Sequence, residues 1–227
     1  MAERGRRAAI FDLDGTLIDS APDLLEALNH VLAQQGRRRA DLNEVKMMMG
    51  RGVAHLLDKG LAATGGVPPE GVHEAMVKAF LEYYEAHIAV HSLLFPGVVE
   101  TLTILRDAGH RLAVCTNKMQ HFADKVLEAM KLDASFETVI GGGATGFYKP
   151  DPEHLGAVLE RLGLRPNDAV MVGDSINDVA AAKALKMPVA VLTYGYSPEA
   201  VWGLGADKVL ERFDALPAAL AELASTP

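Results

Sequence analysis

Two acidic residues end the first apolar run of the chain, in the stretch Phe11-Asp12-Leu13-Asp14-Gly15-Thr16. The run itself, Ala8–Leu13, is apolar at nearly every position, as expected for a parallel strand buried on both faces. The acids would then lie at the carboxyl edge of a sheet, where open α/β sheets bind ligands. Asp and Gly also mark simple turns after strands, so this interpretation depends on the rest of the chain.

Further apolar runs of the same kind alternate with helical stretches. They are Leu112–Thr116, Thr138–Gly141, Ala169–Gly173 and Val189–Thr193, followed by a short edge-strand candidate at Lys208–Leu210. This alternation predicts right-handed β-α-β units. We therefore expect an α/β fold with a doubly wound, Rossmann-like parallel sheet.

The first connection is too long for a simple crossover, because about 95 residues separate the first two predicted strands. Apolar residues at helical spacing predict that this segment is all-helical, and Ser20 with Asp23 resembles a capping box at its first helix. We expect a helical cap domain at 19–92, inserted into a core of residues 1–18 and 93–227. Short joints at both ends favour a lid that rocks as a body.

The composition limits the classes of partner. The 227 residues are 49% hydrophobic and 23% charged, which is ordinary for a globular protein. The formal net charge of −8 predicts neither nucleic acid nor a membrane as partner, because both call for a basic face. A small anionic substrate would need local cations or a metal. The single cysteine, Cys115, lies in an apolar run and predicts a buried thiol in a reducing, cytoplasmic setting.

Polar residues also follow two other apolar runs. The second run ends in Thr116-Asn117-Lys118 and the fourth in Gly173-Asp174-Ser175-Ile176-Asn177-Asp178. Pooled at one edge of the sheet, the four aspartates Asp12, Asp14, Asp174 and Asp178 would repel unless a cation lay between them. Oxygen ligands favour Mg²⁺. A bound phosphate strengthens this requirement, since a carboxylate about 4 Å from one negative charge costs about 4 kcal/mol at an effective dielectric of about 20.

Lys149 stands in the stiff segment Tyr148-Lys149-Pro150-Asp151-Pro152, just past the third run. Pro150 and Pro152, which follow it, disfavour a helix there, so the lysine could present a fixed ammonium to the same edge. An ordinary solvated loop lysine is the alternative.

Two rival patterns carry less weight. Gly141, Gly143 and Gly146 spell a dinucleotide fingerprint, but Pro150 follows where a helix would have to begin. His87 and His91 are four residues apart, without a third metal ligand nearby in the sequence.

Together, the motifs resemble those of the haloacid dehalogenase superfamily. Asp12-Leu13-Asp14-Gly15-Thr16 is similar to its first motif, D-x-D-G-T, and Thr116 to its second. Lys149 before Pro150 is similar to the third motif, and Gly173–Asp178 to the fourth, G-D-x-x-x-D. They occur in the family's order over nearly the whole chain, and the helical insert resembles the family's C1 cap.

The resemblance implies a role for each motif residue. Asp12 would attack phosphorus and form an aspartyl-phosphate, while Asp14 would protonate the leaving alcohol and later activate water. The Thr116 hydroxyl and the Asn117 backbone amide would hold phosphate oxygens. Lys149 would neutralise the nucleophile and the phosphate.

The same resemblance implies a metal site. Mg²⁺ would be held by the Asp12 carboxylate, the backbone carbonyl of Asp14 and Asp174, with Asp178 as an outer or direct partner. The implied activity is hydrolysis of a small anionic phosphate ester by a monomer or homodimer.

Within the superfamily, two stretches resemble the phosphoglycolate phosphatases. They are Gly50-Arg51-Gly52-Val53 in the insert and Thr193-Tyr194-Gly195-Tyr196 near the end of the chain. This resemblance implies 2-phosphoglycolate as substrate, with Arg51 pairing with its carboxylate. Four alternative functions remain open: another small-ester phosphatase, a pyrophosphatase, a sugar phosphomutase, or a non-catalytic binding protein on the same scaffold. A dehalogenase is disfavoured because Asp14 is present.

Overall fold

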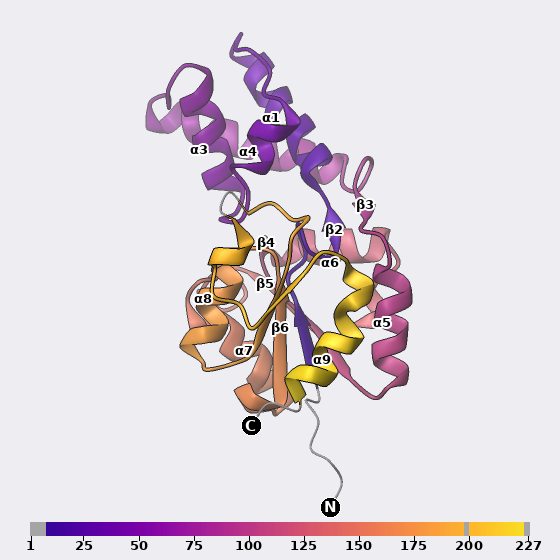
Figure 1. Cartoon of the computed structure of the whole chain (residues 1–227). Coiled ribbons are helices and arrows are strands. Elements are labelled where there is room, and N and C mark those ends of the chain that lie inside the picture. The colour runs from indigo at the N-terminus through magenta and orange to yellow at the C-terminus, as the bar shows by residue number, and fades with distance from the viewer. Residues whose placement is uncertain (1–7, 198–199, 225–227) are drawn as a thin grey trace, which may run out of the picture.

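The structure, a computed structural model, describes residues 8–197 and 200–224, and its centre is a six-stranded parallel sheet (Figure 1). In spatial order the strands are β5 (Thr138–Gly142), β4 (Arg111–Met119), β1 (Ala8–Phe11), β6 (Ala169–Gly173), β7 (Val189–Leu192) and β8 (Lys208–Leu210). The predicted doubly wound sheet is confirmed, with Lys208–Leu210 at its edge. Strand β1 is central, so the carboxyl ends of β4 and β6 flank Asp12.

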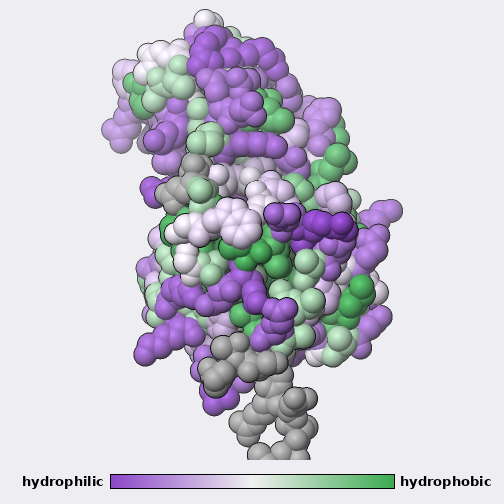
Figure 2. Space-filling view, in the orientation of Figure 1, coloured by the Kyte–Doolittle hydropathy of each residue, from purple (hydrophilic) through white to green (hydrophobic). Residues whose placement is uncertain are grey.

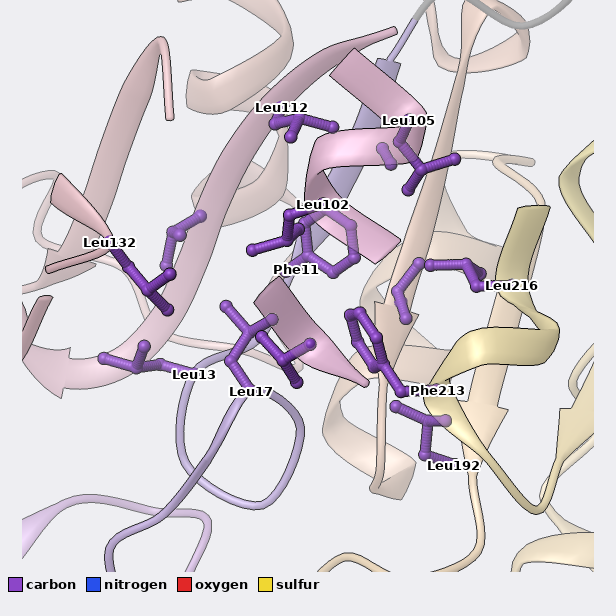
Figure 3. Close-up of a cluster of buried hydrophobic side chains, with 14 of the residues drawn as sticks. Phe11, Leu13, Leu17, Leu102, Leu105, Leu112, Leu132, Leu192, Phe213 and Leu216 are labelled. Atoms are coloured by element: carbon purple, nitrogen blue, oxygen red, sulfur yellow. The ribbon is translucent and has the colours of Figure 1, made fainter. Parts of the chain in front are cut away.

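Helices cover both faces of the sheet. Successive residues of each strand point to opposite faces, so an apolar strand has two faces to bury. Ala9 and Phe11 pack in the cluster of α5 (Val98–Asp107), α6 (Gln120–Ala129) and α9 (Leu216–Ala224). Ala8 and Ile10 pack in the cluster of α7 (Pro152–Leu162) and α8 (Ile176–Ala184). Figure 3 shows Phe11 surrounded by leucines and by Phe213 in the first cluster. Short 3-10 helices lie at Asp133–Ser135, Pro166–Asp168, Val201–Gly203 and Phe213–Ala215.

The long first connection folds into four helices with a hydrophobic cluster of their own. They are α1 (Ala21–Gln34), α2 (Leu42–Lys46), α3 (Val53–Thr64) and α4 (Glu70–Ala86). They stand over the carboxyl end of the sheet, and mostly hydrophilic side chains cover them on the face seen in Figure 2. The chain enters and leaves this unit through an antiparallel ribbon of β2 (Ile18–Asp19) and β3 (Leu93–Leu94).

The capping box predicted at Ser20 is wrong. Helix α1 does begin after Ser20, but this residue makes no side-chain capping bond. Its hydroxyl donates to the Asp14 carboxylate over 2.5 Å instead. The Asp23 carboxylate accepts hydrogen bonds from the backbone N–H groups of His91 and Ser92. Both side chains therefore fasten the start of α1 to the core and to the returning chain.

No helix in the described ranges has the length and apolar character needed to cross a membrane.

Candidate active site

The predicted residues meet at the carboxyl edge of the sheet, where three neighbouring strands end. Asp12 follows β1 and donates its backbone N–H to the Val172 carbonyl of β6. Thr116 and Asn117 belong to β4, and Asp174 follows β6. The order β4-β1-β6 therefore brings residues that are far apart in the sequence to one edge.

Lys149 lies at the centre of this group. Its Nζ is 2.9 Å from Asp12 Oδ1 and 2.6 Å from Asp178 Oδ1, and the residue is buried. Burial opposes the ammonium charge, but Asp12 and Asp178 outweigh it and raise the pKa of Lys149. Burial also raises the pKa of Asp12 to about 6, against the attraction of Lys149. For Asp174, burial and then the charge of Asp178 raise the pKa well above its ordinary value.

The carboxylates form a cation site. One oxygen from each of Asp12, Asp174 and Asp178 lies within 4.8 Å of the others. Oxygens bound to one Mg²⁺ at about 2.0–2.1 Å would lie about 3–4 Å apart, so these three side chains fit a divalent cation. Lys149 balances only one of the three negative charges. The donor set and the charge count therefore favour a metal here.

Two glycines make room for the acids. A Cβ on Gly173 would lie 2.2 Å from Asp178 Cγ, and one on Gly195 would lie 2.2 Å from Asp174 Cβ. Asp178 Oδ2 accepts hydrogen bonds from the backbone N–H groups of Asp174 and Ser175 and from the Ser175 hydroxyl. The start of α8 therefore fixes Asp178 in place.

The Asp14 side chain lies outside the three-carboxylate cluster. Its carboxylate pairs with Lys118 Nζ at 3.1 and 3.2 Å and accepts the Ser20 hydroxyl hydrogen bond. The two acids of the opening stretch thus have different lysine partners: Lys149 for Asp12 and Lys118 for Asp14. This separation is compatible with different chemical roles for the two carboxylates.

Asn117 holds the Lys149 loop through its side chain. Its amide donates to the carbonyls of Lys149 (2.8 Å) and Gly50 (3.0 Å), and its carbonyl accepts from the Lys149 N–H (2.7 Å). Asn177 Nδ2 donates to the same Gly50 carbonyl over 3.1 Å. Two core asparagines therefore clasp one carbonyl of the helical insert; we call this the Gly50 clasp. His154, buried, bonds the Thr116 carbonyl through Nε2 over 2.9 Å.

Two pockets reach Asp12 and Asp14, and both are lined by Met49 and Gly50 of the insert. The first pocket is largely apolar, with Leu24, Val53, Leu56, Tyr84, Phe122 and Lys118 in its wall.

The second pocket carries Arg51, His55 and Lys59, together with Asp174 and Asn177. Burial, followed by the charges of Arg51 and Lys59, lowers the pKa of His55. Arg51 is exposed and lines this second pocket, so its place near the site agrees with the sequence expectation, while its role stays a prediction.

Sequence reasoning missed four residues at this edge: Lys118, Asn177, Tyr84 and Tyr196. Tyr196 donates its N–H to Asp174 Oδ2 and its hydroxyl to Asp19 Oδ1, so it ties a site carboxylate to the ribbon of the insert. Lys118, Asn177 and Tyr196 all stood inside stretches that the sequence analysis quoted, so their positions in the motifs were a signal that they lie near the site. Tyr84 carried no signal of a site in the sequence.

A doubly wound sheet whose central strand ends in a lysine-paired aspartate, beside a carboxylate cation site, is the arrangement expected of an α/β hydrolase that acts on phosphoric esters. The chain belongs to the haloacid dehalogenase-like hydrolase family, whose model matches residues 9–192. The predicted membership is thereby confirmed.

Several similar proteins are named phosphoglycolate phosphatase. The phosphoglycolate phosphatase of Caulobacter vibrioides is 43% identical, and the match covers 92% of this chain and 88% of that protein. The one from Mesorhizobium japonicum is 37% identical, with 96% of each chain covered. A crystal structure of a predicted phosphoglycolate phosphatase from Haemophilus somnus 129PT has a TM-score of 0.91 at 29% identity, covering 96% of this chain and 99% of that one.

Proposed function

We propose that the protein is a Mg²⁺-dependent phosphatase that hydrolyses 2-phosphoglycolate to glycolate and phosphate through an aspartyl-phosphate on Asp12. The observation that carries the proposal is the buried bridge of Lys149 between Asp12 and Asp178, beside Asp174. The names of relatives up to 43% identical over most of their length support the choice of substrate.

The side chains suit a two-step hydrolysis. An Asp12 carboxylate oxygen bonds to phosphorus as the ester oxygen leaves, and Asp14 gives that oxygen its proton. Asp14 then takes a proton from the attacking water, which releases phosphate and restores Asp12. Lys149, held 2.9 Å from Asp12, offsets negative charge on the nucleophile and the phosphate. Thr116 and the backbone N–H of Asn117 hold phosphate oxygens.

The proposed metal ligands are the carboxylates of Asp12 and Asp174 and the backbone carbonyl of Asp14, with Asp178 as a direct or outer partner. Mg²⁺ bound there would neutralise charge on the carboxylates and the phosphate. Without it, the cluster leaves one ammonium against three acidic side chains.

The helical insert at 19–92 would serve as the lid of the core formed by 1–18 and 93–227. The Gly50 clasp supports this proposal, because it joins an insert loop to two residues at the sheet edge. Water would be excluded from the first pocket while the clasp is made. A cytoplasmic location and a monomeric or homodimeric state stay predictions.

The test is phosphate release from a panel of small phosphate esters, with Mg²⁺ and with excess chelator. We expect the highest kcat/KM for 2-phosphoglycolate and no turnover without the metal. A higher kcat/KM for pyrophosphate or a sugar phosphate would refute the substrate, and the absence of any turnover would support a binding protein.

A further inference from the structure

Lys118 and Tyr84 meet across the joint between the core and the helical insert. Lys118 is the penultimate residue of β4, and its Nζ lies 4.9 Å from the ring centroid of Tyr84 on α4. Both side chains line the first pocket, and both are nearly inaccessible, at 8% exposure for Lys118 and 1% for Tyr84.

Lys118 is the single cation among the described residues that line the first pocket. Lys149 does not line this pocket, and its ammonium lies between Asp12 and Asp178. The Lys118 ammonium makes two hydrogen bonds, both with the Asp14 carboxylate, and it has three hydrogens to donate. It therefore has the capacity to bind one more acceptor in the pocket. Because Asp12 and Asp14 repel any anionic leaving group here, such a group needs this cation beside it.

The Tyr84 hydroxyl provides an independent observation. It is buried and finds no acceptor for its hydrogen among the residues that the structure describes; its polar neighbour is the Lys118 ammonium, which is itself a donor. Burial raises the pKa of Tyr84, against the opposing charge of Lys118, so the hydroxyl keeps its proton and can donate it. A buried donor without an acceptor is unfavourable, and an anionic oxygen of a bound ligand would satisfy it.

We infer that Lys118 and Tyr84 together bind the carboxylate of the substrate in the first pocket and make the enzyme selective for carboxylate-bearing phosphate monoesters. This inference rests on the proposed phosphatase function and names the groups that set its substrate class. The apolar walls formed by Leu24, Val53 and Leu56 suit the short carbon chain between phosphate and carboxylate. Because Lys118 belongs to the core and Tyr84 to the insert, the receptor is complete only while the insert stands on the core.

The test compares 2-phosphoglycolate with ethyl phosphate, which has the same two-carbon length and no carboxylate. The measured quantity is the ratio of kcat/KM for the two esters. We expect Tyr84→Phe and Lys118→Met each to lower this ratio at least about tenfold, as loss of a hydrogen bond to a charged group does. Lys118→Arg, which keeps the charge, should retain most of the preference.

Urea unfolding separates an effect on substrate recognition from an effect on folding. The Tyr84 hydroxyl has no acceptor to lose, so the urea midpoint of Tyr84→Phe should equal or exceed that of the wild type. This variant keeps the inference testable even if Lys118→Met fails to fold. A clearly lower midpoint together with an unchanged ratio would mean that Tyr84 has only a structural role, and would overturn the inference.

Three further outcomes are decisive. If the wild type prefers 2-phosphoglycolate but the Lys118 and Tyr84 variants keep that preference, the inference is wrong and the proposed function stands. A larger loss of preference in Arg51→Ala than in Lys118→Met would overturn the inference in favour of the second pocket. If the wild type shows no preference, the proposed substrate fails and the carboxylate receptor fails with it.

Discussion

Replacing Asn117 with alanine removes the side chain that joins the Lys149 loop to the Gly50 clasp. The change leaves the backbone N–H and carbonyl of Lys149 without their hydrogen-bond partner, because Asn117 binds them at 2.7 and 2.8 Å. A buried backbone group left unsatisfied costs about 1–3 kcal/mol, so two such groups predict a loss of about 2–6 kcal/mol in the free energy of unfolding. The Gly50 carbonyl adds little to the loss, because it keeps its bond from Asn177.

Asn177→Ala is the matched control. It removes one hydrogen bond of 3.1 Å to the same carbonyl, which stays bound to Asn117. The expected loss is about 0.5–1.5 kcal/mol, the net value of a single hydrogen bond.

Urea unfolding measures both losses, provided that the dependence on urea concentration matches the wild type. Turnover gives a second readout. Asn117→Ala should lower kcat by about 100-fold, since a displacement of about 1 Å at a catalytic group has that effect. If Asn117→Ala were no less stable than Asn177→Ala, the Lys149 loop would not depend on this side chain, and the reasoning would be refuted.

Three other outcomes follow from the site and the core. Asp12→Asn should abolish phosphate release and leave the circular dichroism spectrum unchanged, because the amide has the same shape and is a poor nucleophile; turnover near the wild-type rate would contradict the mechanism. Gly173→Ala should destabilise the fold by about 1–3 kcal/mol and weaken Mg²⁺ binding in calorimetry, because its Cβ would lie 2.2 Å from Asp178 Cγ. Gly156→Ala in α7 is its control, since nothing lies within 4 Å of the added Cβ, and equal losses would count against the steric argument. Burial raises the pKa of the Cys115 thiol to about 12, so a disulfide reagent at pH 8 should modify Cys115 only in urea, and rapid modification of the folded protein would contradict this.

The strands of the sheet could be predicted because their apolar runs are nearly continuous. Ala169–Gly173 was predicted at its observed bounds, while the second strand was predicted to end at Thr116 and continues to Met119. Asn117 and Lys118 are polar and indicate a strand end, but the β4–β5 pairing extends past them with a shift in register. Pairing with β5 therefore extends β4 past the end that its local sequence indicates.

Contacts between residues far apart in the sequence could not be predicted from local sequence patterns. Asp14 and Lys118 are separated by 104 positions, and neither residue carries a signal of that pairing. Ser20 and Asp23 form a capping pattern in the sequence, yet stronger partners outside the helix take both side chains. Tyr84 carried no signal of a site in the sequence, and its buried hydroxyl without an acceptor is visible only in three dimensions.

The ribbon of β2 and β3 has a consequence for the history of this fold. Because Ile18 pairs with Leu94 and Asp19 with Leu93, the chain leaves the core and returns to it at the same place. The number and arrangement of helices between these points can therefore change without moving the strands that carry Asp12, Thr116 and Asp174. Under the proposed function, a lineage can exchange its helical insert, and with it the leaving group it accepts, while the residues at the edge of the sheet keep their places.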